Sequence, residues 1–303
     1  MAMIQQTTLK TSISCTGIGL HSGEKTSMTM HPAPVDTGIV FERTDLHNGA
    51  RVFPARYDYV CDTFLCTTLT NASGATLATV EHVMAAFSGC GIDNARIEVN
   101  SPELPIMDGS ASPFVFLIEC AGTETLDAPR RALRVQKPVA VMDGDKRASL
   151  APLDGRRVSC EIIYDNERIA RQRASVTLTG ETFKNEVSRA RTFGLMEDVA
   201  GLQASGLALG GSLDNAVVVS GDKILNDGGL RFEDEFARHK VLDAVGDLAL
   251  AGAPLIGAFD GFCSGHALNI QLLKALFADA DAWAWTELYE ESEWEQEPLV
   301  ATA

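Results

Sequence analysis

The run of residues 231–243 concentrates side chains that can move protons or bind metals. On a helix, His239 and Asp243 stand four residues apart, so they share one face about one turn apart. Asp247 extends the same stripe by another turn. An imidazole and a carboxylate so placed can bind one metal ion, although the pattern also fits a surface His–Asp pair. The apolar run 248–251 that follows favours a buried helix, in which both groups need partners.

A second group of reactive side chains stands in residues 79–82, which read Thr-Val-Glu-His. The Glu-His dipeptide resembles half of the HExxH zinc motif with its order altered, and the second histidine is missing. Neighbouring residues on a helix diverge by about 100°. His82 could therefore bind a metal while Glu81 holds a water molecule. A Glu-His pair at a helix start is equally compatible with a favourable charge near the helix dipole.

A third histidine, His266, follows Gly265 at a predicted strand-to-helix turn, where a substrate could reach it. It fits an ordinary helix N-terminal residue equally well. His21, His31 and His47 lie in polar, loop-like segments and are interpreted as ordinary residues.

Taken together, these groups match the needs of a hydrolytic metal site. Two histidines and one carboxylate leave a coordination position open, as catalytic zinc requires. Zinc lowers the pKa of bound water to about 7, and a separate carboxylate can accept the proton released. The pattern predicts a zinc-dependent hydrolase in which a metal-bound hydroxide attacks a carbonyl group.

The predicted elements that position these groups form two similar successions, strands first and helices later. In the first half, strands are expected over 7–15, 26–31, 37–43, 63–69 and 95–99, and helices over 79–89 and 112–121. A polar linker is expected over 123–131. In the second half, strands are expected over 133–141, 147–150, 158–164, 174–178 and 255–261, and helices over 182–190, 232–251 and 266–278.

This succession predicts an α+β fold. We expect an N-terminal α+β domain over 1–126, a C-terminal α+β domain over 127–280 with an apolar insert near 193–211, and an acidic tail over 281–303. Within that tail, residues 287–297 carry six glutamates and no lysine or arginine.

Composition limits the partners and the compartment. The formal charge of −16 argues against nucleic acid as the main partner. Seven cysteines, an odd number without a CxxC pair, predict reduced thiols in the cytoplasm. No stretch approaches the apolar length needed to cross a bilayer, and the first residues lack a secretory signal pattern. We expect a monomer.

Six blocks of the chain carry a family resemblance: residues 79–82, 105–111, 188–194, 210–212, 229–235 and 239–243. They resemble one family, the UDP-3-O-acyl-N-acetylglucosamine deacetylase of lipid A biosynthesis in Gram-negative bacteria. The likeness runs from about residue 8 to about residue 278, nearly the whole chain. The resemblance implies two layered sheet-and-helix sandwich domains with the active site in the cleft between them.

The resemblance also implies a ligand set. His82, His239 and Asp243 are similar to the family's zinc ligands, and Glu81 to its general base. Iron(II) suits the same ligands and is a second candidate metal in the cell.

Further roles follow from the same resemblance. His266 would protonate the departing sugar amine or steady the anionic intermediate, with Asp247 orienting and charging it. Thr192 would help to hold the oxyanion. Lys240 would contact polar groups of the substrate, a UDP-linked acylated amino sugar.

An apolar insert is the expected site of the acyl chain. Leu195, Val199 and Leu202 fall at i, i+4 and i+7 and form one face, which would also suit a packed core helix. In the family the corresponding insert builds a hydrophobic passage for the acyl chain, and Phe193 begins it here.

Four further positions resemble positions that contact the nucleotide or lie near the metal in the family. Lys146 and Tyr164 resemble positions that meet the uridine diphosphate end. Cys263 stands where relatives often have a basic residue, so nucleotide affinity would differ. Cys66 matches a cysteine near the family's metal, and we interpret it as a wall of the pocket. The alternative function is a zinc amidase that acts on another acetylated sugar.

Overall fold

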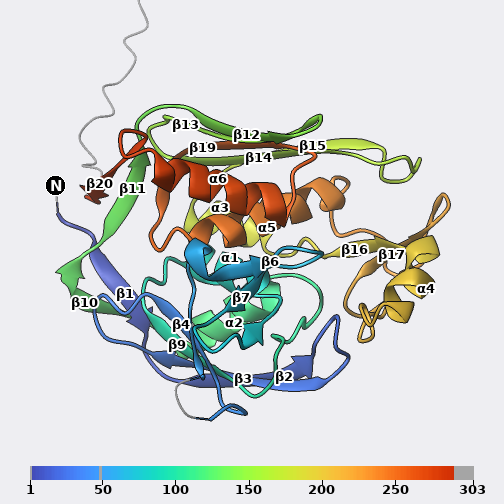
Figure 1. Cartoon of the computed structure of the whole chain (residues 1–303), viewed down its shortest axis with the longest axis horizontal. Helices are drawn as coiled ribbons and strands as arrows, with labels where there is room; N and C mark the ends of the chain where they lie inside the picture. Colours follow the sequence, from blue (N-terminus) through green and yellow to red (C-terminus); the bar gives the residue numbers. More distant parts are fainter. Residues whose placement is uncertain (1, 48–49, 290–303) are drawn as a thin grey trace, which may run out of the picture.

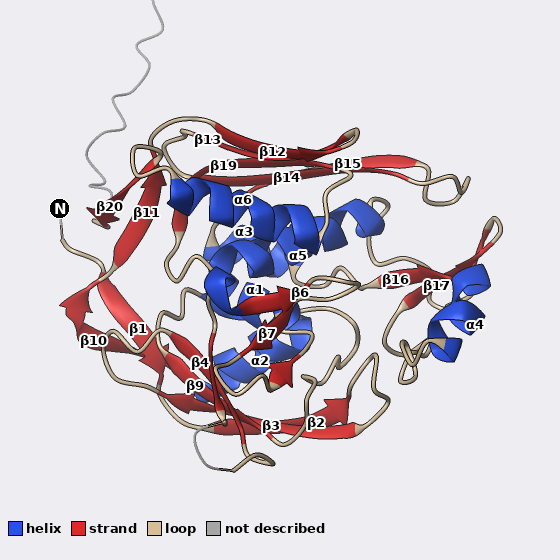
Figure 2. Cartoon of the chain, in the orientation of Figure 1, coloured by secondary structure: helices blue, strands red, loops and turns tan. Residues whose placement is uncertain are grey.

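The computed structural model describes residues 2–47 and 50–289. Most of its helices lie between two layers of strands, while α4 (Met196–Ala204) lies to one side, so the α+β prediction is confirmed (Figure 1, Figure 2). N-terminal strands form one outer layer and C-terminal strands the other, with α1 and α5 in the interior (Figure 1).

The first half builds a five-stranded sheet in the order β2-β3-β9-β4-β5, in which β4 runs parallel to β9. A separate ribbon pairs β1 with β10, and β6, β7 and β8 form a small sheet. The strands are β1 (Gln5–Leu9), β2 (Ile13–Ile18), β3 (Lys25–Pro32), β4 (Ile39–Arg43), β5 (Val52–Pro54), β6 (Val60–Asp62), β7 (Thr68–Thr70), β8 (Thr76–Leu77), β9 (Ala95–Val99) and β10 (Thr123–Pro129). The helices are η1 (Tyr57–Tyr59), α1 (Glu81–Cys90) and α2 (Ser112–Ala121).

Strand β3 shows why this sheet forms. Met28 and Met30 are buried and alternate with more exposed residues, as a strand with one face on the core requires. Helix α1 buries Val83 and Phe87 against the same core and ends at Gly91, whose φ of 72° suits a left-handed cap.

The second half contains a seven-stranded sheet with β19 at its centre, flanked by β13, β14 and β11. A smaller sheet, β16-β17-β18, carries α4 beside it. The strands are β11 (Arg131–Val135), β12 (Val139–Asp143), β13 (Lys146–Ala151), β14 (Arg156–Ile163), β15 (Arg171–Thr177), β16 (Phe193–Leu195), β17 (Val217–Ser220), β18 (Lys223–Ile224), β19 (Leu255–Phe262) and β20 (Trp283–Glu287). The helices are α3 (Gly180–Thr182), the π-helical turn η2 (Phe183–Val187), α4 (Met196–Ala204), α5 (Glu235–Ala249) and α6 (His266–Ala278).

Three expectations need correction. The polar segment 123–131 is no linker, because β10 pairs antiparallel with β1 and most of its residues are exposed. The expected tail begins too early, because β20 pairs antiparallel with β11, while residues 290–303 lie outside the described part. The strand expected over 63–69 is mostly a loop, and β7 begins only at Thr68.

Helices α1 and α5 come from different halves and touch through their backbones. A Cβ atom at Gly246 would overlap the carbonyl oxygen of Glu81, so only glycine permits this approach. The contact fixes the start of α1 against the part of α5 between Asp243 and Asp247, two of the predicted reactive residues.

Candidate active site

Three predicted ligands meet between α1 and α5. Ligand atoms of His82, His239 and Asp243 all lie within 4.8 Å of one another, and all three residues are buried. The Nε2 atoms of His239 and His82 lie 3.2 Å and 4.0 Å from Asp243 Oδ1. The helical spacing thus brings His239 and Asp243 together as predicted, and the contact of the two helices adds His82.

The chemistry of these atoms fits a metal cation. His239 Nδ1 donates a hydrogen bond to the carbonyl oxygen of Ala190 at 3.1 Å, since a carbonyl can only accept. In the neutral ring, Nε2 then turns a lone pair toward a carboxylate oxygen. Two facing acceptors are stabilised by a shared cation. The donor set of two imidazoles and one carboxylate suits zinc and other divalent metals.

The ionisation states agree with this fit. Burial, reinforced by His239, lowers the pKa of His82 to about 3, and burial also lowers the pKa of His239. Burial opposes ionisation of Asp243, but His239 and Lys240 outweigh it and hold the Asp243 pKa well below its usual range. Neutral imidazoles and an ionised carboxylate are the forms that bind metals. Lys240 Nζ donates to Asp243 Oδ2 at 2.9 Å.

A carboxylate and a histidine flank this cluster. Glu81 is 2% exposed, and its Oε2 accepts a hydrogen bond from the Thr67 amide at 3.0 Å. Its Oε1 lies 4.0 Å from His266 Nε2. Burial raises the pKa of Glu81 to about 7, close to the value that suits a general base at neutral pH.

His266 is held by Asp247. The Asp247 Oδ2 atom lies 2.8 Å from His266 Nδ1 and accepts a hydrogen bond from Asn269 Nδ2, while its Oδ1 accepts from Thr67 Oγ1. Burial works against a charged His266, but Asp247 outweighs it and raises the His266 pKa to about 10. His266 is therefore a cation at neutral pH.

The segment around Thr192, just before β16, closes another side of the pocket. Arg191 Nε donates to Glu235 Oε1 at 2.8 Å, and Glu235 also accepts from the amide of Arg191. This buried ion pair ties the segment to the start of α5 and sets Thr192 among the lining residues.

Sequence reasoning missed His21. It lines the same pocket as Glu81 and His266, and both of its ring nitrogens are buried without a hydrogen-bond partner among the described residues. Glu103 accepts from the His21 amide at 2.8 Å and holds the turn. The sequence signal for this turn is the pair of glycines on either side of His21, Gly19 and Gly23, because glycine permits a tight turn and close approach of the backbone.

Four other predicted residues lie outside the ligand cluster, namely Phe193, Tyr164, Lys146 and Cys66. The Phe193 ring centroid is 6.3 Å from that of His239 and 5.6 Å from that of Tyr164. Lys146 is exposed at the start of β13, outside the lining of this pocket. Cys66 is buried, and burial raises its thiol pKa to about 12, which suits a wall more than a ligand.

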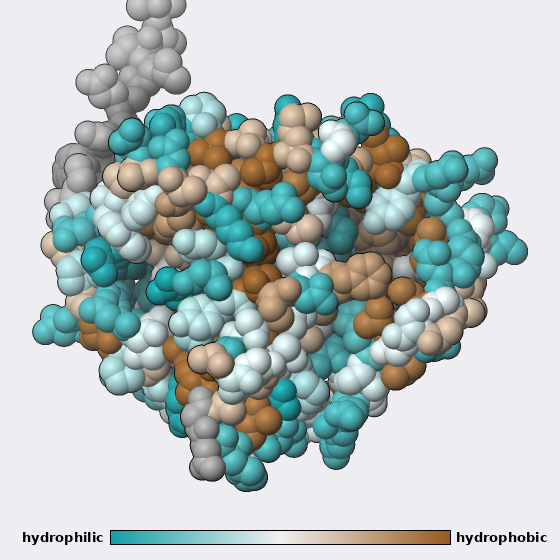
Figure 3. All heavy atoms as spheres, in the orientation of Figure 1, coloured by the Kyte–Doolittle hydropathy of each residue, from teal (hydrophilic) through white to brown (hydrophobic). Residues whose placement is uncertain are grey.

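Helix α4 is not a core helix, since none of its residues is buried. Leu195 and Leu202 are partly exposed, and Met196 and Leu209 are about half exposed. Apolar side chains gather on the surface over β16, β17 and α4 (Figure 3). The packed-core alternative is therefore wrong.

A buried cluster that could hold a metal ion, beside a carboxylate of raised pKa and a histidine paired with Asp247, is an arrangement that suits a metal-dependent hydrolase. The model of the LpxC family, UDP-3-O-acyl N-acetylglycosamine deacetylase, matches residues 6–278, and the chain belongs to this family. It is 51% identical over 291 residues to proteins named UDP-3-O-acyl-N-acetylglucosamine deacetylase from Vibrio parahaemolyticus and Vibrio cholerae. Each of these matches covers 95% of this chain and 95% of the relative. Among the described residues, no helix is long and apolar enough to span a membrane.

Proposed function

We propose that this protein hydrolyses the N-acetyl amide of UDP-3-O-acyl-N-acetylglucosamine, releasing acetate and the free sugar amine, as a step of lipid A biosynthesis. The observation that carries the proposal is the buried cluster of His82, His239 and Asp243 with Glu81 and His266 beside it. The names and 51% identity of the relatives support the substrate.

Zinc is the metal we propose, held by His82, His239 and Asp243, with iron(II) as the second candidate. When bound, such a cation polarises a carbonyl group and makes water more acidic. The seven free cysteines support a reducing, cytoplasmic compartment.

Glu81 is the proposed general base. The Thr67 amide fixes Oε2, which leaves Oε1 to accept a proton from the attacking water. Its raised pKa makes the carboxylate a stronger base than an exposed glutamate.

His266 is the proposed general acid. Its cationic ring can stabilise negative charge on the former carbonyl oxygen and then donate the Nε2 proton to the departing amine. Asp247 keeps the ring oriented and charged. Thr192 would donate its hydroxyl to the same oxygen.

Substrate contacts are proposed for three regions. Phe193, Leu195 and Leu202 would receive the acyl chain along α4 and its small sheet, a role that the partly exposed apolar side chains support. Lys240 would meet polar groups near the metal. Lys146 and Tyr164 would meet the uridine diphosphate.

The test is deacetylation of the UDP-linked substrate by metal-stripped protein, assayed without metal and with stoichiometric zinc or iron(II). Zinc-restored turnover is the expected result. A protein that binds zinc and remains inactive on this substrate would contradict the proposal. Comparing short and long 3-O-acyl chains separates this activity from an amidase for another acetylated sugar.

A further inference from the structure

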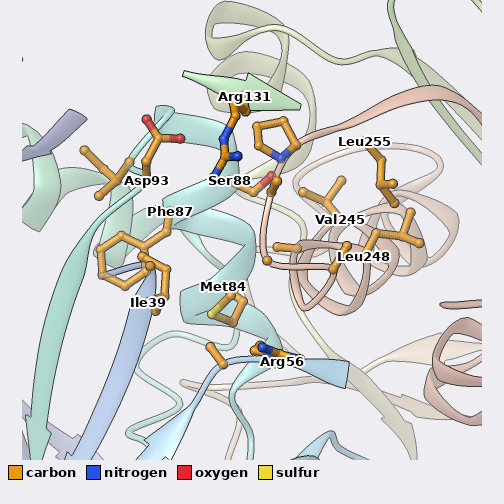
Figure 4. Close-up of a pocket in the computed structure, with 18 of the residues that line it drawn as sticks. Ile39, Arg56, Met84, Phe87, Ser88, Asp93, Arg131, Val245, Leu248 and Leu255 are labelled. Carbon is orange, nitrogen blue, oxygen red and sulfur yellow. The ribbon is translucent and has the colours of Figure 1, made fainter. Parts of the chain in front are cut away.

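A second cavity lies between the two halves of the molecule and shares no lining residue with the catalytic pocket. Its volume is about 480 Å³, within the range of small-molecule sites. Figure 4 shows Met84 and Phe87 of α1 facing it, with Val245 and Leu248 of α5 on another side.

The lining is cationic in a chain of formal charge −16. Five arginines but only two aspartates contribute to it, and the arginines are Arg56, Arg130, Arg131, Arg156 and Arg157. Two of these already have carboxylate partners, Arg56 with Asp58 and Arg130 with Asp93. The remaining guanidinium groups give the cavity an excess of positive charge.

Arg156 is the informative member. Its Nη2 donates to Ser88 Oγ at 2.9 Å, and no carboxylate of the described residues forms an ion pair with it. Burial, reinforced by Arg130, lowers the pKa of Arg156 to about 10. Arg156 is partly buried, a partly buried guanidinium without a counter-ion is unfavourable, and a bound anion would relieve that cost.

The rest of the lining includes an apolar wall built from both helices. Met84 and Phe87 of α1 contribute to it from one side, and Val245 and Leu248 of α5, with Leu255, from another. An arginine fork matches the oxygens of a phosphate group, whereas the apolar wall would cover an organic body. We propose that this cavity binds a phosphorylated organic anion, and that the bound anion acts on the catalytic site through α1 and α5.

The coupling follows from the placement of the lining. Met84 stands two residues after His82 on α1, and Val245 stands two residues after Asp243 on α5. The two helices are in backbone contact at Gly246. A ligand that changes the distance between α1 and α5 would shift the proposed metal ligands on these helices.

The experiment measures binding of hexyl phosphate and of inorganic phosphate to the zinc-loaded protein by titration calorimetry. We expect hexyl phosphate to bind at least about tenfold more tightly than phosphate, because its chain covers the apolar wall. Arg156→Met should weaken hexyl phosphate about tenfold or more. Arg131→Met, at the same cavity, is a second variant that does not depend on the folding of the first. Exposed Arg168, outside the cavity, gives the control Arg168→Met, which should bind like wild type.

Turnover is measured in parallel with and without saturating hexyl phosphate. We expect kcat to change in wild type and Arg168→Met, and not in Arg156→Met. The proposed binding site would be refuted if hexyl phosphate does not bind to wild type. Equal affinity for hexyl phosphate in wild type and both cavity variants would refute it as well. Binding that uridine diphosphate displaces and Arg156→Met leaves intact would assign it to the catalytic pocket and overturn the site as well. Binding at the cavity without a change in kcat would overturn the coupling. The binding arms do not depend on the proposed function.

Discussion

Replacing Asp247 with asparagine should remove the positive charge of His266 at neutral pH while keeping the shape of the site. Burial opposes that charge, but Asp247 outweighs it and raises the pKa of His266 from 6.5 to about 10. The difference corresponds to roughly 5 kcal/mol favouring the charged ring. In the variant, burial would act against only the weaker attraction of Glu81 and Asp243, so the pKa should fall to its ordinary value or below.

The assay has two parts. In metal-free protein, the His266 ring is titrated by NMR, with a midpoint expected near 10 in wild type and at or below 6.5 in Asp247→Asn. In zinc-loaded protein, kcat/KM is measured from about pH 7 to about pH 9. The ratio of wild-type to variant kcat/KM should rise about tenfold for each pH unit, because His266 loses its proton over this range in the variant and keeps it in wild type.

A ratio that is constant with pH would refute the reasoning, because it would mean that Asp247 does not set the charge of His266 or that the charge is not used. Zinc content should be unchanged in Asp247→Asn, since Asp247 lies outside the ligand cluster. Asp145→Asn, at an exposed aspartate, is the matched control.

The sign of the stability effect follows from the same shift. A histidine whose folded pKa is raised contributes stability that is complete below its unfolded pKa near 6.5 and is lost as pH rises toward 10. The melting temperature of metal-free wild type should therefore fall between about pH 7 and about pH 10, and Asp247→Asn should flatten that fall.

Further variants test other parts of the site. Glu81→Ala should keep zinc and lower kcat by about 100-fold or more, since only the base is removed, and loss of zinc on metal analysis would contradict its role. His239→Ala should lose both zinc and activity, and full zinc occupancy would overturn the ligand assignment. Leu202→Ser should raise KM for long-acyl substrates more than for short ones; an equal change for both would count against an acyl surface at α4. Gly246→Ala should lower the free energy of unfolding by about 2 kcal/mol or more in denaturant titrations, whereas Gly201→Ala, with open space at its Cβ, should not destabilise the protein.

Local spacing predicted the helical part of the site well. The interval between His239 and Asp243 is a property of one helix, so it could be read without knowing the fold. The start of α6 at His266 was likewise marked by the preceding glycine. What the sequence could not supply was the distance between α1 and α5, because it depends on the contact of Gly246 with Glu81, two residues far apart along the chain.

The features that were not predicted from the sequence depend on contacts between residues far apart along the chain. His21 carries no helical frame, and its place in the pocket depends on Glu103, which is distant in sequence. Residues 123–131 have few apolar side chains because β10 belongs to an edge ribbon paired only with β1, and an exposed strand has the composition of a linker. Strand β20 was hidden by the acidic residues that surround it in sequence.

Helices α1 and α5, which meet at Gly246, contribute residues both to the candidate metal site and to the second cavity. At one end they hold His82, His239 and Asp243, and farther along they line the arginine-rich cavity. Neither half of the chain alone contains all three proposed ligands, so binding of a metal by them and the packing of the two halves would stabilise each other. Metal removal should therefore loosen the contact between α1 and α5, and any ligand that bridges both helices at the cavity acts on the same equilibrium. Thermodynamic linkage then requires that the proposed anion and the metal change each other's affinity by the same factor.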